Sequence, residues 1–252
     1  MTSAVLPQGA AAGGLLETAL AAHGGLDRWR QFDTVELDVS IGGALWDLKG
    51  QTGLFADTRF RADTRRQSAT LDLSGDPARR LRFAPDQVSL EQVGDAAKEL
   101  RANPRDAFRG HQTETPWDVL HAGYFTAYAL WTYATQPFVY AGENFRTEEL
   151  DPWVENGETW RRLKVTFPDE VATHTREQIT YFGPDGLMRR HDYAVDILGG
   201  ATAAQYIDDY RDIQGLMTPH RRRVYPLGAD NRALPEPLLV SIDVRRARFD
   251  PA

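Results

Sequence analysis

The chain has 252 residues, of which 42% are hydrophobic and 26% charged, and its net charge of -7 comes from acids and bases spread along the whole length. This composition is typical of a globular protein that can bury a sizeable core. The acidic balance argues against a nucleic-acid-binding surface, so we expect no nucleic-acid partner. The absence of cysteine excludes disulfides, thiolate metal sites, cysteine nucleophiles and an acylated cysteine.

The amino-terminal residues differ from the rest of the chain. Residues 1–13 are small and rich in Gly and Ala, and we expect them to form a flexible leader. They contain neither a positively charged start nor a useful apolar stretch, which predicts a cytoplasmic protein. Residues 15–23 then predict a short amphipathic helix that ends at Gly24-Gly25, and a second helical turn follows at 26–30.

The hydrophobic period changes to two from residue 34. Alternate residues between Val35 and Ile41 are apolar, which is the pattern of a half-buried strand. Gly42-Gly43 predicts a reversal of the chain into a further strand at 45–49. More short strands, bounded by Gly, Pro or Asp, are expected at 52–62, 67–73, 79–84 and 86–91, before an irregular polar segment at 95–110.

Strand periodicity returns in the last third of the chain. Glu148-Glu149 lies in a loop-like segment before Pro152. Many short antiparallel strands separated by turns predict a mainly β fold (α+β), a meander with helical additions. No repeat or linker divides the chain. The expected strands are 160–167, 173–182, 187–197, 203–213, 217–225 and 238–246.

A segment without any formal charge runs from residue 119 to 142. It is long enough to cross a membrane, but it contains four tyrosines and a proline, and Tyr and Trp prefer membrane interfaces over the bilayer centre. We therefore expect no membrane span. As a helix, the segment places five aromatic or imidazole side chains on one stripe, at steps of four and three residues. They are Trp117, His121, Tyr124, Tyr128 and Trp131.

This stripe has two interpretations. It is either a core helix whose polar tips bond to strand residues, or one wall of a ligand pocket, since such pockets are mostly apolar with a few converging polar groups.

The carboxy-terminal meander resembles the LolA/LolB-type lipoprotein carriers. The residues concerned are Tyr181-Phe-Gly-Pro-Asp-Gly-Leu-Met-Arg-Arg-His-Asp-Tyr193, then 206–210 and Gly215-Leu-Met-Thr-Pro-His220. The likeness covers the last third well and the rest in outline. It implies that residues 14–252 form one domain, a single curved antiparallel sheet forming an unclosed half-barrel, with an amino-terminal helix and a central aromatic helix on its concave side. Apolar cargo would lie between sheet and helices.

A second likeness concerns the pattern Tyr-Phe-x-x-Tyr-Ala-x-Trp-x-Tyr, which begins at Tyr124, and the strand Arg-His-Asp-Tyr that ends at Tyr193. Both are similar to segments of a set of bacterial proteins, and this likeness implies no particular activity.

These patterns predict an apolar ligand. We expect an apolar or aromatic small molecule, an acyl chain or a lipid to bind between the concave sheet and the aromatic helix. No pair among the six histidines has a metal-binding spacing such as HxH, HxxxH or HExxH, so we expect neither a metal nor another cofactor. The candidate ligand-binding residues are Trp46, Trp117, His121, Tyr124, Phe125, Tyr128, Trp131 and Arg189.

The strand at 187–197 suggests an alternative function. Arg189, His191 and Tyr193 alternate along it and would share one face. Cross-strand pairing of Arg with Asp is the structural interpretation of this region. If that face is concave, His191 would serve as acid and base near neutral pH and Tyr193 would stabilise an oxyanion. The alternative is therefore an enzyme of the isomerase, cyclase or lyase type with His191 and Tyr193 as catalytic residues. A third hypothesis is a module whose sheet edge pairs with a partner chain.

Overall fold

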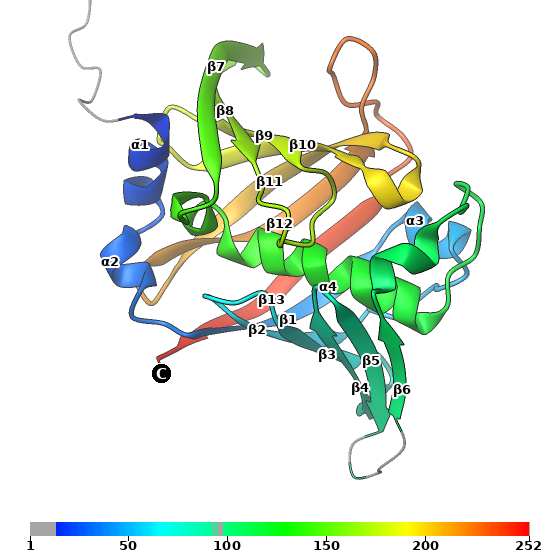
Figure 1. Cartoon of the computed structure of the whole chain (residues 1–252). Helices are drawn as coiled ribbons and strands as arrows, with labels where there is room; N and C mark the ends of the chain where they lie inside the picture. Colours follow the sequence, from blue (N-terminus) through cyan, green and yellow to red (C-terminus); the bar gives the residue numbers. More distant parts are fainter. Residues whose placement is uncertain (1–13, 93, 95–97, 252) are drawn as a thin grey trace, which may run out of the picture.

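The computed structural model describes residues 14–92, 94 and 98–251. The predicted leader, residues 1–13, lies outside the described residues. Most of the chain forms one antiparallel sheet in the order β6-β5-β4-β3-β2-β1-β13-β12-β11-β10-β9-β8-β7. The sheet curves around a central helix, with one half above it and the other below in Figure 1. The edge strands β6 and β7 do not pair with each other, which confirms the unclosed antiparallel half-barrel.

The last strand, β13, joins the two halves of the sheet. It pairs with β12, the strand before it, and with β1. Among the described strands every pair of neighbours except β1 and β13 is consecutive along the chain. The strands are β1 (Thr34–Gly42), β2 (Thr58–Asp63), β3 (Ala69–Leu73), β4 (Asp76–Ala84), β5 (Gln87–Gln92), β6 (Lys98–Ala102), β7 (Arg146–Glu155), β8 (Glu158–Thr166), β9 (Glu177–Phe182), β10 (Met188–Val195), β11 (Ala201–Ile213), β12 (Leu216–Pro226) and β13 (Val240–Asp250).

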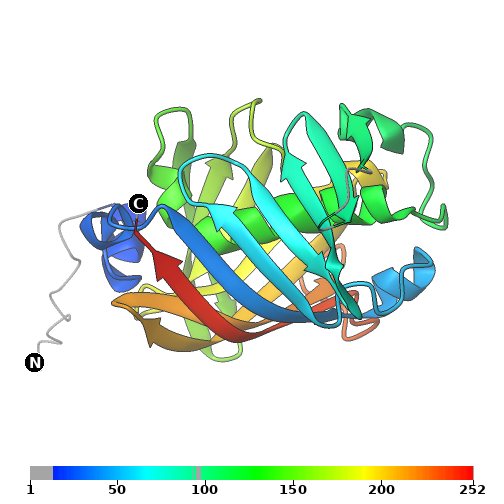
Figure 2. The same cartoon turned by 90° about the horizontal axis from the view of Figure 1, so that it is seen from below.

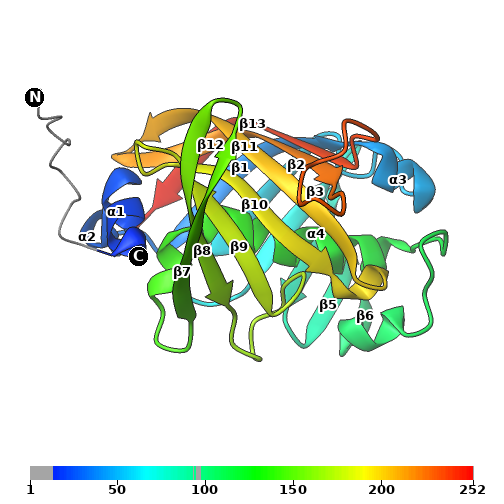
Figure 3. The ribbon, with the colours of Figure 1, turned by 90° about the horizontal axis from the view of Figure 1, so that it is seen from above.

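The central helix α4 crosses the concave side of the sheet, between the two halves seen in Figures 2 and 3. Nearly all of its residues are buried, which explains why the segment is uncharged, because a helix that is apolar all round is normally a buried one. The helices are α1 (Leu15–Ala22), α2 (Leu26–Trp29), α3 (Ala44–Leu48) and α4 (Val119–Thr135), with 3-10 turns η1 (Pro104–Phe108), η2 (Phe138–Ala141) and η3 (Asp196–Leu198).

Local chemistry fixes both ends of α4. Asp118 is the N-cap: its side chain accepts a hydrogen bond from the His121 backbone N–H, and the His121 ring accepts one from the Asp118 backbone. Arg101 of β6 donates to the same carboxylate at 2.6 Å. At the other end Gln136 is extended, as expected for a residue that precedes proline.

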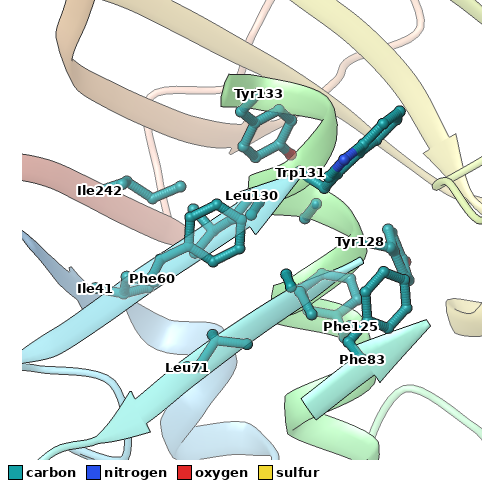
Figure 4. Close-up of a cluster of buried hydrophobic side chains, with 14 of the residues drawn as sticks. Ile41, Phe60, Leu71, Phe83, Phe125, Tyr128, Leu130, Trp131, Tyr133 and Ile242 are labelled. Carbon is teal, nitrogen blue, oxygen red and sulfur yellow. The ribbon is translucent and has the colours of Figure 1, made fainter. Parts of the chain in front are cut away.

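The core lies between α4 and the inner face of the sheet. Figure 4 shows Ile41, Phe60, Leu71 and Phe83, from β1 to β4, facing the side chains of α4, together with Ile242 of β13. All five strand residues are buried. In β1 buried and half-buried positions alternate, as the period of two predicts.

The prediction of a strand at 45–49 is wrong, because these residues form α3. Gly43 has a φ of +111° and lies so close to the Leu239 carbonyl that a side chain would not fit. The first free N–H groups of α3 are satisfied by the carbonyls of Leu238 and Leu239. The chain therefore leaves the sheet here, and the strand expected at 52–62 begins only at Thr58.

Two edge strands were not predicted. β6 lies in the segment expected to be irregular, and β7 contains Glu148-Glu149, which were expected in a loop. Both strands are rich in charged residues, and β7 is mostly exposed, so neither shows an alternating apolar pattern. Charge on edge strands is how proteins prevent unwanted pairing with other chains. Pro152 is tolerated because β7 has only one neighbour and a register shift at this point.

Candidate functional site

A cavity of about 330 Å³ lies between α4 and the sheet. Its walls come from α3, from one side of α4, and from the inner faces of β1 and of β10 to β13. The solvent-exposed members of this lining mark the mouth, and they are Ala44, Leu48, Thr113, Ala201, Thr202 and Pro237. The lining is almost entirely carbon, contributed by side chains such as Leu45 and Val224.

The cavity follows α4 for two turns. Phe125, Ala129 and Tyr133 line it at intervals of four residues, and Thr126 and Leu130 lie beside them. Two turns correspond to roughly 12 Å at 1.5 Å per residue. The cavity thus runs from the mouth near α3 to an inner end near the carboxy terminus of α4.

Four buried side chains form a hydrogen-bonded chain at the inner end. The Tyr193 and Tyr133 hydroxyls lie 2.8 Å apart, and Tyr133 Oη lies 2.8 Å from His174 Nε2. On the other side of the imidazole, Nδ1 lies 3.2 Å from the Tyr128 hydroxyl. The rings of His174 and Tyr193 stack with centroids 4.1 Å apart. Of these four residues, Tyr133 and Tyr193 line the cavity.

Burial determines the protonation states of these four hydrogen-bonded side chains. It lowers the pKa of His174 to about 3, with Arg105 as a smaller cause, so the imidazole is neutral. Burial also raises the pKa of Tyr133 to about 12 and holds the pKa of Tyr128 and Tyr193 well above the ordinary value. All three phenols therefore keep their protons at neutral pH.

Two residues expected to bind the ligand, Trp46 and Phe125, line this cavity, and so does Tyr193, which was expected as a catalytic residue. Trp131 does not: its indole donates to the Asp63 carbonyl at 2.9 Å. The physical reason is that α4 is buried on every side, so the predicted stripe and the cavity occupy different arcs of the helix. Trp117, His121, Tyr124 and Tyr128 also lie outside the lining.

Three of those four residues pack against phenylalanine rings, whereas Tyr128 bonds to His174. Trp117 and His121 pack against Phe108 of η1, and Tyr124 packs between Phe108 and Phe83. A different arc of α4 faces the cavity, and its residues also recur at helical spacing, so the sequence could have predicted it as a second stripe. These residues are Phe125, Ala129, Leu130 and Tyr133.

His191 is sealed in the core rather than facing the cavity. It is fully buried, and both ring nitrogens lie 3.3–3.4 Å from the side-chain amide nitrogen of Gln136. Burial lowers its pKa well below the ordinary value. Its ring packs against Tyr193 with centroids 5.0 Å apart. The histidine that hydrogen-bonds to the cavity-lining Tyr133 is His174, which lies just before β9 in the segment expected to be a strand and was not predicted as a site residue.

Arg189 does not share a face with His191, which corrects the prediction from strand alternation. The pairing of β10 with β9 shifts register between Met188 and Arg190, and such a bulge breaks the alternation of side chains. The guanidinium points outward and pairs with Asp185 at 2.8 Å and with Glu158 at 3.5 Å.

Lys49 supports the mouth and was not predicted as part of the site. Its ammonium donates to the carbonyls of Thr113 at 2.5 Å, Thr115 at 3.2 Å and Gln112 at 3.4 Å, and it lies 5.0 Å from the centre of a Trp117 ring. These bonds hold the segment before α4 against α3. Burial lowers the pKa of Lys49.

Within the described part of the chain, no group of three or more His, Asp or Glu side chains is arranged to hold a metal ion. Of the helices in that part, none has the length and hydropathy needed to cross a bilayer.

No protein-family model and no curated protein matches the chain significantly. Among solved structures it is similar to a LolA superfamily protein from Nitrosomonas europaea, with 10% identity, 94% of each chain covered and a TM-score of 0.51. It is also similar to an outer membrane lipoprotein-sorting protein domain from Vibrio parahaemolyticus, with 10% identity, 93% and 91% of the two chains covered, and a TM-score of 0.52. The chain has a LolA-like fold. This confirms the resemblance to the lipoprotein carriers that the sequence indicated, as far as the fold is concerned.

Proposed function

We propose that this protein binds a largely apolar small molecule or acyl chain in the cavity between α4 and the concave sheet. The observation that carries the proposal is a carbon-lined space of about 330 Å³ inside a protein interior, because interiors are otherwise packed as densely as organic crystals. Ligand pockets have volumes of ~300–1,000 Å³, so the cavity lies at the small end of that range. One solved structure of similar fold is described as a lipoprotein-sorting domain, which also supports an apolar ligand.

The energetics favour filling the cavity with carbon. Apolar cavities hold water poorly, and removing apolar surface from water contributes about 25 cal/mol per Å². A flexible chain that enters from the mouth would cover the surfaces of Phe125, Ala129 and Leu130 along α4. The acid–base alternative lacks comparable support, because His191 does not line the cavity.

Ala129→Phe tests the proposal. Ala129 lines the cavity, so the added ring would occupy the free space without displacing packed atoms. We expect 1-decanol to bind the wild-type protein, measured by calorimetry and thermal shift, and to bind Ala129→Phe at least tenfold more weakly. The matched control is Ala141→Phe, which should bind as the wild type does. Ala141 is an exposed alanine at the end of η2 and does not line the cavity.

Two results would contradict the proposal. One is the absence of binding to the wild-type protein by 1-decanol, decane and decanoate alike, combined with no co-purifying apolar molecule in native mass spectrometry. The other is equal binding by Ala129→Phe and wild type.

A further inference from the structure

The hydrogen-bonded chain at the inner end of the cavity has one proton more than it has acceptors. A neutral imidazole carries one N–H and each phenol one O–H, so His174, Tyr128, Tyr133 and Tyr193 bring four protons to three hydrogen bonds. One O–H group therefore has no acceptor within the chain of four.

Three proton arrangements satisfy all three bonds. If Tyr128 donates to His174, the imidazole donates to Tyr133, Tyr133 donates to Tyr193, and the Tyr193 O–H is left over. If Tyr193 instead donates to Tyr133, which then accepts from both neighbours, the Tyr133 O–H is left over. If every bond of the first arrangement is reversed, the Tyr128 O–H is left over. A buried donor without an acceptor is unfavourable, because it loses its hydrogen bonds to water. Tyr193 and Tyr133 line the cavity and Tyr128 does not, so an oxygen atom of a ligand can accept this hydrogen bond from Tyr193 or from Tyr133. Tyr193 is the simpler donor, because Tyr133 already contacts both of its neighbours in the arrangement.

Arg222 adds a positive charge beside this donor. The residue is 4% exposed, donates to the Gln205 side-chain oxygen at 2.7 Å and to the Tyr133 carbonyl at 2.8 Å, and lies 5.0 Å from the centre of the Tyr133 ring. No carboxylate of the described residues lies within ion-pair distance of it. A guanidinium does not lose its proton in a protein, so the charge persists.

The protein compensates this charge only in part. The Tyr133 carbonyl belongs to the last turn of α4, whose dipole supplies the equivalent of about half a negative charge. The Gln205 amide nitrogen, beside the oxygen that accepts from Arg222, has no acceptor among the described residues. Arg222 also lines a small space of about 40 Å³, which shares Leu130, Tyr133 and Ile242 with the main cavity. Among the described residues, the inner end thus has donors without acceptors, namely a phenol O–H and the Gln205 amide N–H, and a guanidinium without a carboxylate partner, that of Arg222.

We infer that the apolar ligand ends in a carboxylate that is seated at the inner end of the cavity, where Tyr193 donates to an oxygen and Arg222 supplies the countercharge. The ligand class is a medium-chain fatty acid whose alkyl chain follows α4 toward the mouth. This inference rests on the proposed function and names the head group. Lys49 is the cation that lines the main cavity itself, but it already directs its ammonium at three main-chain carbonyls and is therefore the weaker candidate.

The test compares decanoate with 1-decanol by calorimetry at pH 7.5. A hydrogen bond to a charged acceptor is roughly twice as strong as a neutral one, so we expect decanoate to bind wild type at least about tenfold more tightly than decanol. Tyr193→Phe and Arg222→Met should each reduce this preference to within about twofold. Tyr140→Phe is the matched control, because its phenol is equally buried, bonds to Gln136 and Thr180, and does not line the cavity. It should retain the preference.

The outcomes separate the inference from the proposed function. If decanol and decanoate bind wild type equally, the carboxylate assignment is wrong and the apolar site stands. If the preference survives in Tyr193→Phe and disappears in Lys49→Met, the head group lies at the mouth and the inference is overturned. If no decyl compound binds, the proposed function itself fails. Should Arg222→Met not fold, Tyr193→Phe and the ligand comparison on wild type decide.

Discussion

Gly123 of α4 lies directly against Leu81 of β4, so close that a Cβ atom at Gly123 would come within 2.7 Å of Leu81 Cδ1. The missing side chain lets the helix backbone approach this half of the sheet. Gly123 faces β4, whereas Phe125, Thr126 and Ala129 of the same helix line the cavity. The Gly123 contact therefore helps to set how far α4 stands from the opposite wall.

Gly123→Ala should destabilise the protein although alanine is the better helix former by about 1 kcal/mol. Leu81 is fully buried and must move, and overpacking of this kind costs about 1–3 kcal/mol. Urea denaturation of Gly123→Ala, Leu81→Ala and the double variant measures the coupling. We expect the double variant to lose less stability than the two single losses combined. Additive losses, or a stabilised Gly123→Ala, would show that the two residues are not in conflict.

A buried ion cluster stabilises the outer face of the same sheet. Arg190 is fully buried; it donates to both oxygens of Asp192 at 2.6 and 2.7 Å and to Glu155 at 2.7 Å. The Asn231 carbonyl accepts a further bond at 2.6 Å. Arg190 and His191 are adjacent in β10 and so face opposite sides of the sheet.

Arg190→Met should cost about 3–5 kcal/mol, because it leaves two buried carboxylates without their partner. Arg221→Met is the matched control: Arg221 pairs with Asp208, and both side chains are about half exposed, so little change is expected. Urea denaturation measures both. Equal effects of the two substitutions would mean that the Arg190 cluster contributes no more than a surface pair.

Stability should fall as the pH drops below the ordinary histidine pKa. Burial lowers the pKa of His23 to about 4 and of His174 to about 3, and it also lowers the pKa of His191. The native protein keeps these imidazoles neutral, whereas the unfolded chain binds protons below a pH of about 6.5. The stabilisation is thus present above that pH and is lost as the pH falls toward the folded-state pKa values.

Between pH 7 and 5.5 each of these histidines should cost about 1 kcal/mol, and the three together about 3–4 kcal/mol. The slope of unfolding free energy against pH tests this value. His191→Gln removes one titrating group, so its slope over this range should be about a third smaller than that of wild type, whatever its stability at pH 7. An unchanged slope would mean that His191 is not held neutral in the native state.

Most of the fold could be predicted from regular hydrophobic patterns in the sequence. The alternation in β1 indicates which side of the strand is buried, and the uncharged stretch of α4 indicates a helix buried on every side. Both elements were predicted. The edge strands β6 and β7 were not, because an edge exposed to solvent has no apolar pattern to read. α3 was missed because its conformation depends on Gly43 packing against Leu239, a contact between residues far apart in sequence.

The site was predicted less completely than the fold. Phe125 and Tyr193 were expected in a pocket, but one stripe of α4 could not be told from another, because both repeat at helical spacing. Arg189 was misplaced by a bulge, which strand parity cannot detect. His174 and Arg222 are recognisable only in three dimensions, since their importance comes from the phenols that surround them and from the absence of a nearby carboxylate among the described residues.

Lys49 should hold the mouth of the cavity in place. Its three bonds to the carbonyls of 112, 113 and 115 join α3 to the segment that leads into α4. Lys49→Met keeps the length of the side chain and its contact with Trp117 but removes the donors. We expect a loss of about 1–3 kcal/mol, because the freed carbonyls are partly buried.

Hydrogen exchange distinguishes this local role from a general one. In Lys49→Met the amides of residues 112–117 should exchange faster than in wild type. Those of β8 and β9, which do not line the cavity, should change only as much as the global stability does. Because Thr113 and Lys49 both line the cavity, decanol should then leave the variant faster than wild type. Uniform acceleration of exchange throughout the sheet would show instead that Lys49 supports the whole fold rather than the mouth.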